Sequence, residues 1–166
     1  MFVAVTVLLL LPTRLHAQEL TVTLSPGAVN FALTKGSAVN AGNATIAVTT
    51  SWSLALLHFH DTVSLYAYFS SSTAALVHVN PANTVDIPSA RVEVSINGAA
   101  RVPLNQTAPF GAPSAGRLIF SQGAGGLFGL TGNRTDSLAL NINLSGYTLP
   151  ADTYTGTLRL RALATP

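Results

Sequence analysis

The octapeptide RVEVSING, residues 91–98, decides the fold class of this chain. Within it, Val92, Val94 and Ile96 alternate with polar or charged residues, which is the two-residue period of a strand with one buried face. The pair Asn97-Gly98 follows at once, and this pair readily adopts the positive φ angles of a tight hairpin turn. A strand that ends in such a turn predicts an antiparallel hairpin.

The same two-residue period recurs along most of the chain. Apolar and polar residues alternate in further runs at residues 20–24, 29–33, 46–52, 63–69, 118–120, 138–144 and 154–162. One-sided alternation is typical of antiparallel sheets, whereas buried parallel strands are apolar throughout. Roughly eight or nine such strands predict an all-β fold, an antiparallel sandwich with Greek-key connections. Residues 53–59 are apolar at both odd and even positions, so they fit either a buried strand or a helical turn.

The composition limits the classes of partner. Charged residues make up 8% of the chain, against about 25% in an average protein. Eight basic and six acidic side chains give a net charge of +2, so we expect no nucleic-acid partner. The chain has no cysteine, and its 48% of hydrophobic residues can form the core of one domain without disulfides or a metal.

The N-terminus has the features of a signal peptide. Residues 3–11 form an apolar run that ends at Pro12, and Ala17 is a small residue suited to the cleavage site, although no Lys or Arg precedes the run. The run is shorter than the roughly 20 residues that a membrane-spanning helix needs, and Pro12 would break it. We predict a signal peptide at residues 1–17 and a sandwich domain at residues 18–166. The mature chain would be exported to the periplasm, cell surface or medium and would have no membrane span.

Two histidines are candidate metal ligands. His58 and His60 would point the same way from a strand, and His78 or Asp61 could supply a third ligand. Metal sites normally need three protein ligands in register, and no third ligand lies at a recognisable spacing. We therefore predict neither a metal site nor a cofactor.

The sequence also lacks the patterns of common catalytic sites. No serine lies in a nucleophile-elbow pattern, and the glycine-rich residues 123–126 lack the Lys-Ser or Lys-Thr of a phosphate-binding loop. The acidic residues are scattered singly, each expected beside a turn or on an outward strand position: Glu19, Asp61, Asp86, Glu93, Asp136 and Asp152. We predict no catalytic residues and no enzymatic activity.

Aromatic residues are candidates for a ligand or partner surface. In the run at residues 63–69, Val63 and Leu65 share one face of the strand, and Tyr66 and Tyr68 share the other. Together with Trp52, the two tyrosines could form a platform for a sugar ring, so a secreted carbohydrate-binding module is the alternative function. A lone tryptophan in a sandwich is more often part of the core, and outward tyrosines can instead face another chain.

Three segments carry a resemblance to a known family. Residues 29–33 (VNFAL), the predicted strand at residues 45–52 and the closing residues 149–158 (LPADTYTGTL), after a signal peptide, resemble bacterial spore coat protein U-like domains. These domains are related to subunits of archaic chaperone–usher pili, and the resemblance runs from Leu20 to Ala162. It implies an exported immunoglobulin-like sandwich with a structural or adhesive role and no enzymatic residues. Unlike many members, this chain has no cysteine pair.

The predicted first strand suggests how such a protein could assemble. Leu20, Val22 and Leu24 share one face, just before a turn at residues 25–27. The strand could close its own sandwich, or it could add to the edge of a neighbouring subunit, as in pilin-like relatives. The predicted partners are therefore other copies of this chain or other surface subunits, and a periplasmic chaperone that covers the exposed edge.

Overall fold

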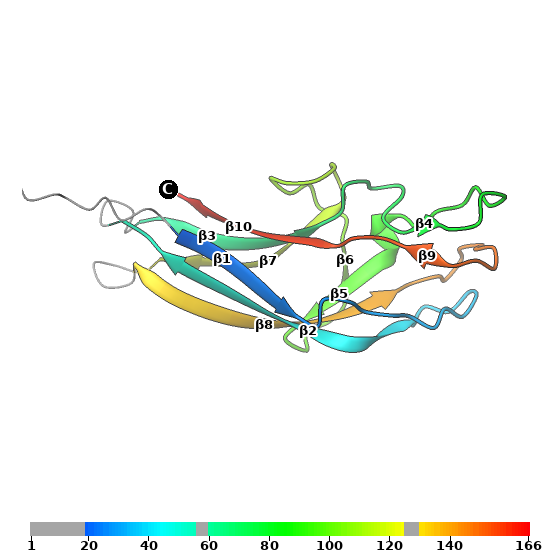
Figure 1. The fold of residues 1–166 in the computed structure, drawn as a ribbon, viewed down its shortest axis with the longest axis horizontal. Helices are drawn as coiled ribbons and strands as arrows, with labels where there is room; N and C mark the ends of the chain where they lie inside the picture. Colours follow the sequence, from blue (N-terminus) through cyan, green and yellow to red (C-terminus); the bar gives the residue numbers. More distant parts are fainter. Residues whose placement is uncertain (1–18, 56–59, 125–129) are drawn as a thin grey trace, which may run out of the picture.

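A computed structural model describes residues 19–55, 60–124 and 130–166 of the chain, which form two stacked antiparallel sheets (Figure 1). The larger sheet has the strand order β1-β2-β8-β5-β6, the second has the order β10-β3-β7, and β4 pairs with β9 in a small third sheet. The prediction of an all-β antiparallel sandwich is confirmed. The elements are β1 (Glu19–Ser25), β2 (Ala41–Ser53), β3 (Thr62–Tyr68), β4 (Val77–His78), the 3-10 turn η2 (Ser89–Arg91), β5 (Val92–Ile96), β6 (Val102–Pro103), β7 (Gly116–Gly123), β8 (Thr131–Ile142), β9 (Tyr154–Thr155) and β10 (Arg159–Thr165).

The core lies between the facing sides of the two large sheets. Strand β3 shows how alternation produces it, since Val63, Leu65 and Ala67 are fully buried while Tyr66 and Tyr68 lie on the opposite face. The same main cluster includes residues of β2, β5, β7 and β8. A smaller cluster near β9 contains Ile87, Ile142, Leu144 and Leu149.

The hairpin turn predicted after β5 is confirmed. Asn97 and Gly98 have φ angles of 52° and 77°, and the Ala99 N–H donates to the Ile96 carbonyl at 3.0 Å. Positive φ at both central positions matches the twist of antiparallel strands. Asn97 also ties this turn to β8, because its backbone N–H donates to the Ser137 carbonyl at 2.8 Å.

The predicted strand at residues 29–33 is wrong. Only Phe31 forms a bridge there, to Gly42, so these residues lie beside β2 without a continuous ladder. The Asn30 N–H donates to the Asn43 side-chain oxygen at 2.9 Å instead of to a backbone carbonyl. The alternation therefore reflected partial burial of the side chains, because backbone pairing is limited to the Phe31 bridge and to the Asn43 N–H, which donates to the Asn30 carbonyl at 2.9 Å.

Two other strands differ from their predicted form. In β7, a bulge separates the pairs Leu65↔Phe120 and Tyr66↔Leu118, so Ile119 and Phe120 are both buried and Leu118 is exposed. The extra residue in a bulge breaks the two-residue alternation. The predicted strand at residues 154–162 is divided into β9, which pairs with β4, and β10, which pairs with β3.

Strand β8 begins well before the predicted strand and carries an ion pair on its inner face. Asp136 is 1% exposed and pairs with Val48 of β2, so the prediction of an outward position is wrong for this residue. Its carboxylate accepts from the Arg134 guanidinium at 2.9 Å, and that guanidinium lies 4.6 Å from the centre of the Phe120 ring. The ion pair raises the pKa of Arg134, chiefly through the hydrogen bond to Asp136. Asp61 lies beside a turn, as predicted, and is buried.

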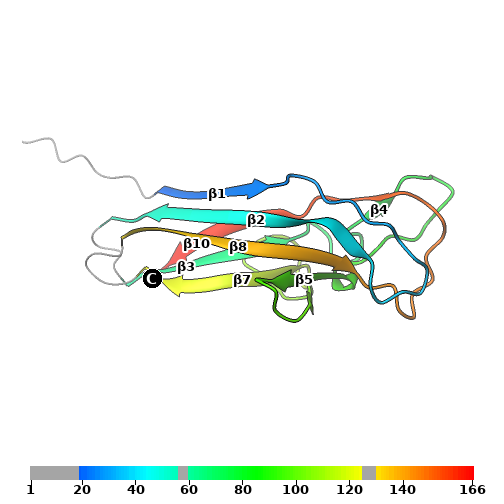
Figure 2. The same ribbon diagram turned by 90° about the horizontal axis from the view of Figure 1, so that it is seen from below.

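The two sides of the sandwich close differently. On one side, Gln106 and Gly116 exchange backbone hydrogen bonds of 2.8 and 2.9 Å, which link the segment after β6 to β7. On the other side, β1 and β10 contact each other but belong to different sheets. Figure 2 shows β1 at the outer edge of the sheet, next to β2. No helix in the described residues is long and apolar enough to cross a membrane.

Candidate functional site

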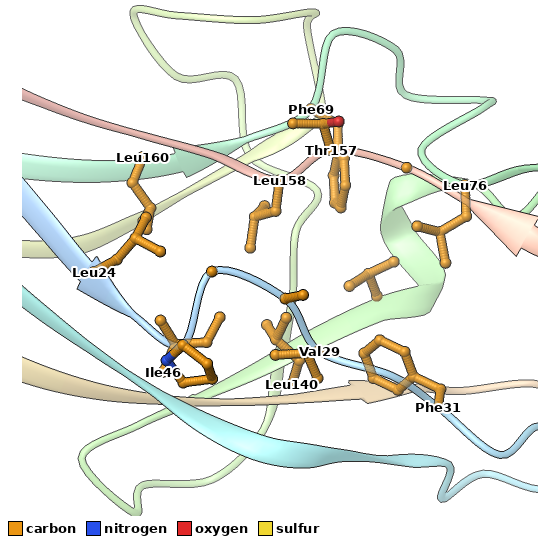
Figure 3. Close-up of a pocket in the computed structure, with 15 residues that line it drawn as sticks. Leu24, Val29, Phe31, Ile46, Phe69, Leu76, Leu140, Thr157, Leu158 and Leu160 are labelled. Atoms are coloured by element: carbon orange, nitrogen blue, oxygen red, sulfur yellow. The ribbon is translucent and has the colours of Figure 1, made fainter.

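An apolar groove opens between the sheets on the side formed by β1 and β10 (Figure 3). Its volume is about 260 Å³. An engineered apolar cavity of about 150 Å³ can hold benzene, so this groove has room for more than one small apolar group. Thr157 carries the side-chain hydroxyl in the lining. The other lining residues are Leu24, Pro26, Gly27, Ala28, Val29, Phe31, Ile46, Phe69, Leu76, Val92, Leu140, Gly156, Leu158 and Leu160.

The groove forms where both edge strands lose their regular pairing. The ladder between β1 and β2 ends at Ser25, and Pro26 has no N–H with which to extend it. On the opposite wall, β10 begins only at Arg159. Just before it, Gly156 lies so close to the Ala75 carbonyl that a Cβ would collide with it. A proline and a glycine thus lie beside the groove, at the points where the two edge strands lose their regular pairing.

The predicted strand-exchange residues lie together on β1. Leu20 and Val22 are half-buried and pack against the main core, whereas Leu24 is 45% exposed and lines the groove. Within the described chain β1 pairs only with β2, in the register Leu20↔Trp52 to Leu24↔Val48. The strand thus occupies the edge of its own sandwich, with its apolar face turned inward.

The predicted aromatic platform is not assembled as one surface. Trp52 is 7% exposed, belongs to the main core, and lies over Gly132 of β8. Tyr66 and Tyr68 lie on the outer face of the other sheet. Burial of Trp52 leaves only the two tyrosines as candidates for a ligand or partner surface.

Phe110 joins the two tyrosines on this outer face. Its ring centre is 6.1 Å from that of Tyr66 and 5.8 Å from that of Tyr68. The Arg161 guanidinium lies 4.4 Å from the centre of the Phe110 ring. We did not predict this contribution, because Phe110 belongs to a loop and has no periodic pattern that assigns it to a sheet face.

The predicted histidine site is only partly described. His58 lies outside the described residues, and His60 lies just before β3. His78 is in β4, at the opposite end of the sandwich from the start of β3 (Figure 1), and its Nδ1 lies 2.7 Å from an Asp86 carboxylate oxygen. Among the described residues, no group of three or more His, Cys, Asp or Glu side chains is arranged to hold a metal ion.

An aspartate organises the loops at the β4–β9 end. The Asp152 carboxylate accepts hydrogen bonds from the Asn80 backbone, the Asn83 side chain and the Thr153 backbone, the shortest at 2.7 Å. These bonds, first among them that from Asn83, lower the pKa of Asp152. Asn83 also donates to the Tyr154 hydroxyl at 2.9 Å. The cluster ties residues 80–83 to the segment before β9, which is a structural role.

Comparison with known proteins identifies no relative. No family model matches the chain, and neither the curated proteins nor the solved structures include a match.

Proposed function

We propose that this chain is an exported structural or adhesive surface protein that assembles with itself by strand exchange. In the assembly, β1 of one copy takes the edge position beside β2 of the next copy. The observation that carries the proposal is the apolar groove between β1 and β10, on the side of the sandwich that lacks the Gln106–Gly116 bridge.

The position of β1 suits exchange. The strand is at the N-terminal end of the sandwich, and within the described chain a single ladder joins it to β2. A β1 strand from another copy could form the same ladder and bury Leu20 and Val22 against the same core. Backbone hydrogen bonds would supply affinity, and the alternate side chains would supply specificity.

The groove would lie where two exchanged copies meet. The segment that leaves β1, at Pro26 to Val29, forms part of the groove wall together with the exposed side chain of Leu24. If this segment extended toward a neighbour, apolar side chains of that neighbour would cover the groove. Burial of apolar surface is worth about 25 cal/mol per Å², so covering this patch favours association.

The sequence features agree with export and assembly. Cleavage after Ala17 would leave Gln18 directly before β1, so the exchanging strand would stand at the mature N-terminus. The resemblance to spore coat protein U-like domains points to the same role and the same immunoglobulin-like connectivity. An unpaired apolar edge is an aggregation hazard, which explains the expectation of a periplasmic chaperone partner.

Deletion of residues 18–24 tests the proposal. The intact protein released from cells should be larger than a single chain by size-exclusion chromatography with light scattering. The deletion variant should lose the large species, and by circular dichroism its melting temperature should fall because no Leu20 or Val22 packs against the core. An intact protein that is always a monomer, with a deletion variant that unfolds, would show that β1 serves only its own sandwich.

A further inference from the structure

The outer face of the β10-β3-β7 sheet repeats one pair of side chains. Tyr68 of β3 lies directly opposite Arg159 of β10, and Tyr66 lies opposite Arg161. Residues opposite each other in an antiparallel ladder have Cβ atoms about 5 Å apart. The next pair on the same face lies two residues, or about 7 Å, along the strands. The face therefore presents two successive Tyr–Arg pairs in the same orientation.

A loop holds these side chains in place. Phe110 contacts both tyrosines and lies under the Arg161 guanidinium, 4.4 Å away. The next residue, Gly111, has a φ of 79°, and a Cβ there would come within 2.5 Å of the Tyr68 ring. The Ala112 N–H then donates to the Phe69 carbonyl at 3.2 Å, which fastens the loop to the end of β3. A ligand would meet rings that are already ordered, which lowers the entropic cost of binding.

The charged residues in the strands of this sheet are all positive. The sequences of β3, β7 and β10 contain three arginines and no acidic residue. Arg159 and Arg161 are exposed. Exposed guanidinium groups form charge-assisted and frequently bidentate hydrogen bonds with carboxylates. The face is thus suited to a ligand with negative charge, although the whole chain is nearly neutral.

We propose that this face binds an acidic polysaccharide, with one uronate unit at each Tyr–Arg pair. A sugar ring would lay its C–H groups on the tyrosine, and its carboxylate would accept from the arginine opposite. A repeating polymer fits because the pair of side chains is itself repeated. Nucleic acid fits less well, because its affinity depends on neutralising many phosphates and this face offers two exposed arginines.

This binding goes beyond the proposed assembly. The Tyr–Arg pairs lie on β3 and β10, whereas strand exchange uses β1 and β2. Either proposal can therefore fail without the other.

Polygalacturonate and its fully methyl-esterified form provide a matched pair of probes, because they share a backbone and differ in charge. Isothermal titration of the mature protein at about 0.15 M salt should show binding to polygalacturonate and at least roughly tenfold weaker binding to the ester. Replacing both arginines, Arg159→Gln with Arg161→Gln, should weaken binding by about tenfold or more. Arg101→Gln removes an exposed arginine from the β5–β6 hairpin and should leave binding unchanged.

The double replacement Tyr66→Leu with Tyr68→Leu tests whether sugar rings stack on the tyrosines. It keeps both arginines and should also weaken polygalacturonate binding by about tenfold. Melting curves show whether each variant is folded. If the tyrosine variant does not fold, the arginine variants alone test the proposal. Absence of binding, equal binding of the ester, or an equal loss with Arg101→Gln would overturn the proposal. Equally tight binding of single-stranded DNA would do so as well, because it would indicate unselective attraction of polyanions.

Discussion

Asn141 should be among the most sensitive polar positions in the sandwich. It lies on the outer face of β8, which alternation predicts to be wet, yet its side chain is fully buried under residues 37–40. Its oxygen accepts from the Asn40 N–H at 2.8 Å, and its amide group donates to the Ala38 carbonyl at 3.1 Å and to a Glu93 carboxylate oxygen at 2.8 Å. This one amide joins a long loop to two strands.

The replacement Asn141→Ala should lower the free energy of unfolding by about 3 kcal/mol. The buried Asn40 N–H loses its acceptor, which costs about 1–3 kcal/mol, and the charge-assisted bond to Glu93 is lost as well. For a domain of this size, the melting temperature should fall by roughly 10 °C. Urea denaturation followed by circular dichroism measures the free energy directly.

Asn143→Ala is the matched control. Asn143 donates to the other Glu93 oxygen at 2.9 Å, but its side chain is half-exposed, so water can replace the lost bond. Its removal should cost less than about 1 kcal/mol. Equal and small losses for the two variants would refute the reasoning that burial of the Asn141 hydrogen bonds makes them important.

Three other features give testable predictions: the Arg134–Asp136 ion pair, the hydrogen bonds of Asp152, and the loop at Gly111 that contacts Tyr68. Asp136→Ala should lower the free energy of unfolding, measured in urea, by about 3 kcal/mol because it leaves the Arg134 charge without its partner. The double replacement Arg134→Met with Asp136→Leu removes both charges and should recover most of this loss. The pKa of Asp152 is lower in the folded protein than in the unfolded chain. The ionised carboxylate therefore stabilises the fold at pH values above the pKa of the unfolded chain, and this stabilisation is lost as the pH falls through the pKa of the folded protein. The difference in melting temperature between the native protein and Asp152→Asn should therefore be larger at about pH 6 than at about pH 2. Gly111→Ala should lower the melting temperature and weaken polygalacturonate binding, because a Cβ at a φ of 79° adds strain of about 1–2 kcal/mol and displaces Tyr68.

Regular alternation allowed much of the sandwich to be predicted from the sequence. The inward positions of β3 and β5 agree with prediction because each strand keeps the two-residue period from end to end. The turn at Asn97-Gly98 was predictable because its residue types suit positive φ. In such segments, the local sequence is enough to predict which residues face the core.

The incorrect predictions have a different physical origin. The bulge at Ile119 adds one residue to β7, and it is defined by the pairing with the partner strand β3. The segment around Phe31 partly buries its apolar side chains as an edge strand would, but the Asn43 side chain accepts one of its backbone hydrogen bonds. Burial of Asp136 depends on Arg134 and on a turn in another hairpin. Each of these features involves a contact with residues distant in the sequence, such as the bond from Asn97 to Asp136.

The candidate sites show the same limit. The apolar face of β1 was predictable from Leu20, Val22 and Leu24, but the groove beside it is formed by segments from most of the chain. The paired tyrosines were predictable from their spacing, whereas their arginine partners depend on the register between β3 and β10. Trp52 belongs to the core because Gly132 of β8 leaves room for its ring.

Cysteine cross-linking tests strand exchange most directly, because the chain has no cysteine of its own. Thr21 of β1 lies opposite Ser51 of β2, at a spacing that a disulfide can bridge. Thr62 of β3 and Thr165 of β10 form a matched control pair that strand exchange does not separate.

The measurement is the yield of disulfide-linked dimers when two single-cysteine variants are expressed together and exported. Strand exchange predicts abundant dimers from Thr21→Cys with Ser51→Cys and few from Thr62→Cys with Thr165→Cys. The account is contradicted if the first mixture gives no more dimers than the second while the double variant Thr21→Cys with Ser51→Cys forms its disulfide entirely within one chain.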